Sequence, residues 1–171
     1  KAADFLLKEQ NRDGSWGNHT RTKGLNVLCP YPEGPRSFRT ASTSLCVIGL
    51  LTSPLKEDPA VKASLDKALQ YLLTTLPTLK RGDTRTVLGV WGHAYGLSAL
   101  SRAARNLPAD APLREELKKV ASLQVKALDQ MADVQGGWGY YTFETFSKRP
   151  IGEPTSFLTA TVPVSYTHLR A

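Results

Sequence analysis

Four side chains are candidates for acid–base chemistry: the carboxylic acids Asp133, Glu144 and Glu153 and the imidazole of His93. The three acids lie near the Trp138-Gly139 segment and the helix expected from residue 154. Two carboxyl groups at the mouth of a cavity are what glycoside hydrolysis requires. His93, beside Trp91, is a candidate base or sugar contact, although a lone histidine on an aromatic helix face is more often a core residue. All four are therefore weak catalytic candidates.

A second group of side chains is suited to an apolar cavity. The candidate lining residues are Phe38, Trp91, His93, Tyr95, Tyr140, Tyr141 and Phe157. Most of them stand at expected helix starts, and the tyrosine pair stands in the loop before the last helix. Aromatic faces suit hydrocarbon chains and can stabilise a carbocation. Aromatic side chains also fill ordinary cores, so both interpretations stay open.

The two cysteines, Cys29 and Cys46, offer little chemistry. They are 17 residues apart, form no Cys-x-x-Cys motif and have no histidine at metal-ligand spacing. The sequence therefore predicts no metal site and no cofactor. Whether the two cysteines pair in a disulfide stays open, because a single pair of cysteines does not reveal the redox compartment.

Composition narrows the class of protein. The chain has 171 residues, of which 41% are hydrophobic and 22% charged, as in one globular domain rather than a disordered or membrane-spanning chain. The net charge of +7 is not gathered on one expected helix, and no nucleic-acid motif is present. We therefore expect no nucleic-acid partner. A cytoplasmic or membrane-surface location fits this composition best, and export stays open.

Paired helices must position these side chains. Apolar stripes at helical spacing predict an outer helix after Asp58, a second after Asp110, and inner helices over residues 40–51, 86–105 and from 154. Residues 18–36 read as an irregular loop. The motif Pro-x-Ser-Phe-x-Thr-Ala occurs at 35–41 and again at 154–160, and a degenerate copy lies at 89–94. An outer and an inner helix thus form a repeat of about sixty residues, and such repeats bury their apolar faces by stacking.

The first seventeen residues resemble the QW repeat of squalene cyclases, oxidosqualene cyclases and protein prenyltransferase β-subunits. The matching positions are Lys1, Ala2, Phe5, Leu6, Gln10, Gly14 and Trp16. In that family the glutamine and tryptophan join neighbouring outer helices. The resemblance therefore implies a structural clasp at Gln10, Gly14 and Trp16, with a second copy at Gly137 and Trp138.

The resemblance also implies a fold and a boundary. Residues 1–163 would be an all-α fragment, a partial α/α toroid of about three outer and inner helix pairs, whose partner would be the rest of its own toroid. Residues 164–171 resemble the translated read-through of a sequencing adapter, so we expect the native chain to end near Pro163. His168 would then be no ligand.

The catalytic motifs of the resembled family are absent from this chain. Class II cyclases protonate an alkene with an Asp-x-Asp-Asp-Thr-Ala segment, and residues 155–160 keep only its threonine and alanine. Protein prenyltransferases bind zinc through Asp-x-Cys, and neither Cys29 nor Cys46 has that aspartate. The leading hypothesis is therefore an aromatic-lined cavity for an isoprenoid or similar apolar molecule, with catalysis open and peripheral membrane contact allowed. A non-catalytic scaffold is the alternative, and a carbohydrate-active toroid is the third.

Overall fold

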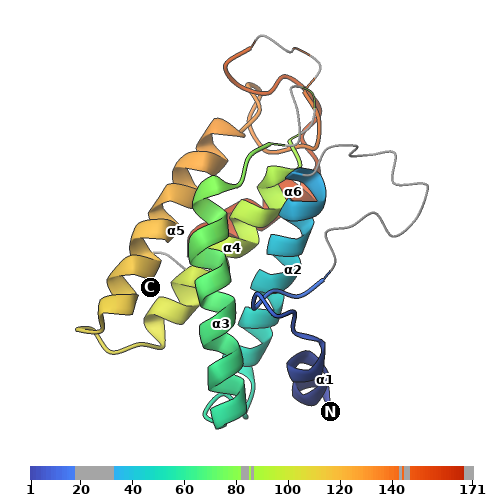
Figure 1. The fold of residues 1–171 in the computed structure, drawn as a ribbon. Coiled ribbons are helices and arrows are strands. Elements are labelled where there is room, and N and C mark those ends of the chain that lie inside the picture. The colour runs from blue at the N-terminus through green and yellow to red at the C-terminus, as the bar shows by residue number, and fades with distance from the viewer. Residues whose placement is uncertain (18–32, 82–84, 86, 143, 145–146, 168–171) are drawn as a thin grey trace.

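The computed structural model describes residues 1–17, 33–81, 85, 87–142, 144 and 147–167 (Figure 1). These residues form six α-helices and one 3-10 turn, with no strand among them. The helices are α1 (Ala2–Glu9), α2 (Glu33–Thr52), α3 (Pro59–Thr75), α4 (Gly89–Arg105), α5 (Pro112–Gln130) and α6 (Ser156–Thr167), and the turn is η1 (Leu76–Thr78). The expected all-α class is confirmed for the described part of the chain.

The start of α3 follows from its local sequence. Asp58 precedes the helix in an extended conformation, and its carboxylate accepts hydrogen bonds from the backbone N–H of Ala60 (2.8 Å) and Val61 (3.4 Å). These bonds satisfy two of the four amide groups that a helix leaves unpaired at its first turn. The sequence also predicts Asp110 as the cap of α5. That prediction is wrong, because Ala111 holds the cap position and no side chain bonds to the first turn of the helix.

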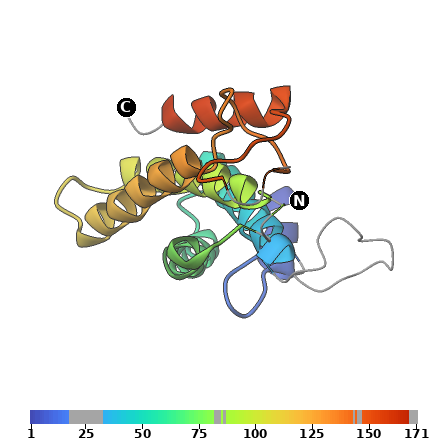
Figure 2. The same ribbon diagram turned by 90° about the horizontal axis from the view of Figure 1, so that it is seen from above.

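Helix α4 forms the centre of the fold. It packs against α2, α5 and α6, and α3 and α6 lie on opposite sides of it in the view from above (Figure 2). Most of its residues are buried, including Val90, Leu97 and Leu100. A helix enclosed on so many sides is apolar around most of its circumference, which is the pattern that distinguished residues 86–105 in the sequence.

Two helix boundaries differ from the expectation. Helix α2 begins at Glu33, inside the stretch interpreted as loop, because Pro35 lies in the first turn, where no amide donor is needed. Helix α6 continues through Pro163 to Thr167, and Ser165 is only 2% exposed. The helix therefore does not end where we expected the native sequence to end. Residues 168–171, with His168, lie outside the described residues.

None of the described helices combines the length and the apolar character needed to cross a membrane.

Candidate functional site

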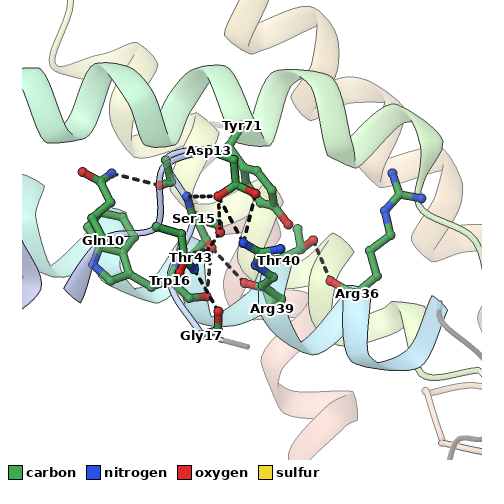
Figure 3. A network of polar contacts seen from close by, with 12 residues as sticks. Gln10, Asp13, Ser15, Trp16, Gly17, Arg36, Arg39, Thr40, Thr43 and Tyr71 are labelled. Carbon is green, nitrogen blue, oxygen red and sulfur yellow. Dashed lines mark hydrogen bonds and ion pairs between the residues drawn. The ribbon is translucent and has the colours of Figure 1, made fainter. Parts of the chain in front are cut away.

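The tryptophan of the first motif is buried at the junction of three helices (Figure 3). Trp16 is 4% exposed, and its indole N–H donates to the carbonyl oxygen of Leu6 in α1 at 2.7 Å. Its backbone N–H donates to the hydroxyl of Thr43 in α2 at 3.0 Å. Trp16 therefore connects the chain that follows α1 to α1 through its ring and to α2 through its backbone.

The glutamine of the motif joins α1 to the neighbouring helix α3. The Gln10 amide nitrogen donates to the carbonyl oxygens of Gly14 and Ser64, both at 2.9 Å, and its amide oxygen accepts from the Ser64 hydroxyl at 2.9 Å. Ser64 lies within α3 rather than at its end. We call the contacts of Gln10, Gly14 and Trp16 the clasp. Its glutamine joins the end of α1 to the second turn of α3, whereas the resemblance places such bonds at a helix end.

A charged contact beside the clasp was not anticipated from the sequence. Arg39 on α2 bonds to the carboxylate of Asp13 at 2.9 and 3.1 Å, and its guanidinium lies 5.7 Å from the centre of the Tyr71 ring on α3 (Figure 3). Burial raises the pKa of Asp13. Hydrogen bonds from Ser15 and the charge of Arg39 lower this pKa by more than burial raises it, so the net shift is downward. Because 26 residues separate Asp13 and Arg39, no local sequence pattern reveals the pair.

The second Trp-Gly loop repeats the tryptophan contacts of the first. The Trp138 indole N–H donates to the carbonyl oxygen of Leu128 at 2.8 Å, and its backbone N–H donates to the Thr159 hydroxyl at 3.1 Å. Gly136, with φ of 92°, holds the position that corresponds to Gly14, with φ of 87°. Ala132 replaces the glutamine, so this loop keeps only the tryptophan half of the clasp.

Five of the expected cavity aromatics lie together. The Trp91 ring stacks on Tyr95 (5.5 Å between ring centres) and on Phe157 (5.9 Å), and it lies 6.3 Å from Tyr140. Tyr140 in turn contacts Phe157 at 5.8 Å and Tyr141 at 6.3 Å. We call these five residues the aromatic cluster. It joins α4, α6 and the loop between α5 and α6, with Phe157 50% and Tyr141 39% exposed.

Hydrogen bonds hold the loop side of the aromatic cluster in place. The backbone N–H of Val87 donates to the carbonyl oxygen of Tyr140 at 2.6 Å. The backbone N–H of Thr142 donates to the carbonyl oxygen of Arg85 at 2.8 Å. The Trp91 indole N–H donates to the Tyr140 hydroxyl at 3.3 Å. The Trp91 indole N–H is therefore already paired within the cluster.

Phe38 does not join the aromatic cluster. It is 44% exposed on α2, and no ring contact connects it to the cluster among the described residues. The reason is a shift of one helical turn between the two copies. In the second copy the Thr159 hydroxyl accepts from the backbone N–H of Trp138. In the first copy the equivalent bond to Trp16 is made by Thr43, and not by Thr40, which the motif aligns with Thr159. Phe38 therefore lies about one turn away from the place equivalent to Phe157.

The three candidate acids occupy different environments. The Asp133 carboxylate is 5% exposed and accepts from the backbone N–H of Gln135 at 2.8 Å and of Gly152 at 2.7 Å. Both of its oxygens therefore fix the loop that carries Tyr140. Glu144 and Glu153 are exposed. Nothing in these contacts couples the three carboxyl groups into a catalytic pair.

His93 faces away from the aromatic cluster, which differs from the expectation that it shares a wall with Trp91. Two positions along a helix differ by about 200° in direction. His93 is 2% exposed, and its Nδ1 lies 2.7 Å from the amide oxygen of Gln124 on α5. Burial lowers its pKa, and the bond to Gln124 opposes this only in part. His93 is thus a neutral residue between α4 and α5.

Metal-ligating residues do not gather in the described part of the chain, where no three His, Cys, Asp or Glu side chains meet at a common point. Cys46 carries a free thiol, and burial raises the pKa of this thiol. Cys29 lies outside the described residues, so the expectation about a pair concerns a residue that the structure does not describe.

Comparison with known proteins returned no relative. No family model matches the chain, and no curated protein or solved structure does either. The described residues show an all-α protein with two tryptophan-centred loops and an aromatic cluster. The likeness to the QW repeat rests on the motif and on the contacts that its residues make.

Proposed function

We propose that this chain is a helical-repeat protein of the prenyltransferase and squalene-cyclase type, a partial α/α toroid whose aromatic cluster binds an isoprenoid or similar apolar molecule. The single observation that carries the proposal is the meeting of Trp91, Tyr95, Tyr140, Tyr141 and Phe157 from three separate segments. The clasp of Gln10 and Trp16 supports the repeat architecture. Closure into a ring is part of the proposal.

The exposure of the aromatic cluster favours ligand binding over core packing. A ring that only fills a core is covered by its neighbours, whereas half of Phe157 faces solvent. A hydrocarbon chain laid against these rings would remove apolar surface from water, worth roughly 25 cal/mol per Å². Since the Trp91 N–H already bonds to Tyr140, a ligand needs no polar group to satisfy it.

The proposal is binding, without an assigned reaction. Protonation of an alkene needs an acid that can release its proton into the cavity. Asp133, the one buried candidate, accepts two backbone hydrogen bonds and fixes its own loop. The scaffold alternative draws on apolar side chains exposed along α2, Phe38 (44%) and Leu45 (48%), which a protein partner could cover. Among the described residues, no contact favours the carbohydrate-active alternative.

A matched pair of phenylalanine variants tests the proposal. Phe157→Ala removes a ring from the aromatic cluster, and Phe5→Ala removes an exposed ring from α1, where Phe5 is 62% exposed. With farnesol as the probe in isothermal titration calorimetry, we expect Phe157→Ala to weaken binding roughly fivefold, because one stacking contact is worth about 1 kcal/mol. Phe5→Ala should bind as the unchanged chain does. Equal affinity in all three proteins would reject the site.

Trp91→Ala gives a second test from the centre of the aromatic cluster. Trp91 contacts three of the other four rings, so its loss should reduce farnesol affinity more than the loss of Phe157. Circular dichroism identifies a variant that fails to fold. If folded Trp91→Ala binds farnesol normally while Phe157→Ala does not, the ligand contacts α6 rather than the cluster as a whole.

A further inference from the structure

Tyr140 is held at two points within the aromatic cluster. Its carbonyl oxygen accepts from the backbone N–H of Val87 at 2.6 Å, and its hydroxyl oxygen accepts from the Trp91 indole N–H at 3.3 Å. The centre of its ring lies 5.8 Å from that of Phe157. Because Trp91 belongs to α4 and Val87 lies just before that helix, both ends of Tyr140 are fixed relative to α4.

The bond to Trp91 determines which hydrogen bond the Tyr140 hydroxyl can still make. A phenol can donate one hydrogen bond and can also accept, whereas an indole N–H only donates. The Tyr140 oxygen is therefore the acceptor in this contact, and its own proton points away from the indole. No group among the described residues accepts that proton. A hydroxyl that already accepts a hydrogen bond is polarised by it and becomes a better donor.

The other two tyrosines of the aromatic cluster are held by their rings alone. Tyr95 stacks on Trp91, and Tyr141 contacts Tyr140, but neither hydroxyl has a hydrogen-bond partner in the part of the chain that the structure describes. A donor that is already oriented loses less conformational freedom when a ligand binds. Tyr140 is therefore the preorganised donor of the cluster.

This donor lies beside the apolar rings. The Tyr140 hydroxyl is at the edge of the Trp91 ring, because the indole nitrogen that it contacts is part of that ring. Phe157, which is half exposed, stacks on Trp91 with 5.9 Å between ring centres. A molecule that covers Phe157 and its neighbours therefore also lies close to the Tyr140 hydroxyl. If that molecule has no acceptor, it removes the hydroxyl from water without replacing the hydrogen bond, and binding is weakened.

We propose that the aromatic cluster selects apolar molecules that carry an acceptor oxygen, namely terpenoid alcohols, ethers and ketones, and that the Tyr140 hydroxyl donates to this oxygen. The inference rests on the function proposed above, in which the cluster binds an isoprenoid or similar apolar molecule, and it narrows the class of ligand. A hydrocarbon of the same skeleton can cover the same rings but leaves the donor unpaired. Sites that hydrogen-bond their ligand discriminate against analogues that lack the bonding group.

The test combines two ligands with two variants. Farnesol carries a hydroxyl oxygen, and farnesene is a hydrocarbon with the same carbon skeleton. Tyr140→Phe removes the donor and keeps the ring, and it should lower the ratio of farnesol to farnesene affinity about fivefold, as one hydrogen bond of ordinary strength does. Tyr95→Phe removes a hydroxyl of the same cluster that nothing orients, and it should leave the ratio unchanged. Using the ratio cancels effects that both ligands share.

A Trp91→Phe background completes the test, because Tyr140→Phe alone frees the indole N–H, which could then donate to farnesol. An affinity ratio that Tyr140→Phe leaves unchanged in both backgrounds would overturn the role of Tyr140 while the proposed function stands. If neither ligand binds the unchanged chain, the proposed function fails and this inference fails with it.

A measurement on the unchanged chain needs no substitution and decides the question if a variant does not fold. The Cζ resonance of ¹³C-labelled Tyr140 should move more with farnesol than with farnesene, because only farnesol accepts from the phenol. Equal shifts at saturation with the two ligands would overturn the proposal.

Discussion

The clasp predicts a large difference between two glycines that share the same backbone conformation. Gly14 and Gly136 have φ values of 87° and 92° in the two Trp-Gly loops. A Cβ on Gly14 would stand 2.3 Å from the carbonyl oxygen of Lys67 in α3, whereas a Cβ on Gly136 would meet no atom within 4 Å. Substituting each with alanine therefore separates backbone strain from contact with the neighbouring helix.

The expected magnitudes follow from these two environments. Gly136→Ala should cost about 1–2 kcal/mol of unfolding free energy, because alanine is strained at positive φ. Gly14→Ala carries the same strain and must also push the loop away from α3. That movement breaks the two hydrogen bonds between Gln10 and Ser64, each worth about 0.5–1.5 kcal/mol. We expect a total of about 2–5 kcal/mol for Gly14→Ala.

Urea unfolding followed by circular dichroism at 222 nm measures both substitutions. The double change Gly14→Ala with Gln10→Ala should cost little more than Gly14→Ala alone, because the glutamine bonds are already lost. Equal destabilisation by Gly14→Ala and Gly136→Ala would refute the reasoning, since it would mean that the first loop does not press against α3.

Two further predictions concern buried rings. Trp16→Ala should lower the free energy of unfolding in urea by about 3 kcal/mol or more, as deletion of a buried aromatic does. Trp16→Phe should lower it by less, because phenylalanine keeps a ring and leaves only the Leu6 carbonyl without its donor. Burial lowers the pKa of His93 below its ordinary 6.5. Histidine in the unfolded chain therefore takes up a proton at a higher pH than His93 in the folded chain does. The free energy of unfolding should fall as the pH drops below about 6.5, by at most about 1.4 kcal/mol per pH unit. His93→Gln should flatten that slope.

Sequence patterns were reliable where the signal was local and periodic. The apolar stripe after Asp58 and the proline that follows it predicted the start of α3, and the largely apolar stretch 86–105 predicted the buried α4. The start of α2 was placed too late, because Gly34 and Pro35 resemble a loop although a first helical turn accepts both. Such residues carry the same signal in a loop and in a helix start.

Tertiary contacts explain most of what the sequence concealed. The pair of Arg39 and Asp13 and the pair of His93 and Gln124 each join segments more than twenty residues apart. Which residues pair depends on how the helices pack, and the sequence of either segment alone does not reveal that packing. The members of the aromatic cluster were all predicted as lining residues, since Trp91, Tyr95 and Phe157 stand at expected helix starts and Tyr140 and Tyr141 stand in the loop before the last helix.

The wrong prediction for Phe38 shows that two copies of a repeat can keep the same sequence motif while the contacts of that motif differ. The two Pro-x-Ser-Phe-x-Thr-Ala segments align Thr40 with Thr159, 119 positions apart. The bonds to the tryptophan N–H groups instead pair Thr43 with Thr159, 116 positions apart. In that register Phe157 corresponds to Ala41, which is buried, and Phe38 lies one turn nearer the start of its helix. Because a helix presents similar faces every three or four residues, a one-turn shift keeps the apolar pattern and moves the ring out of the cluster.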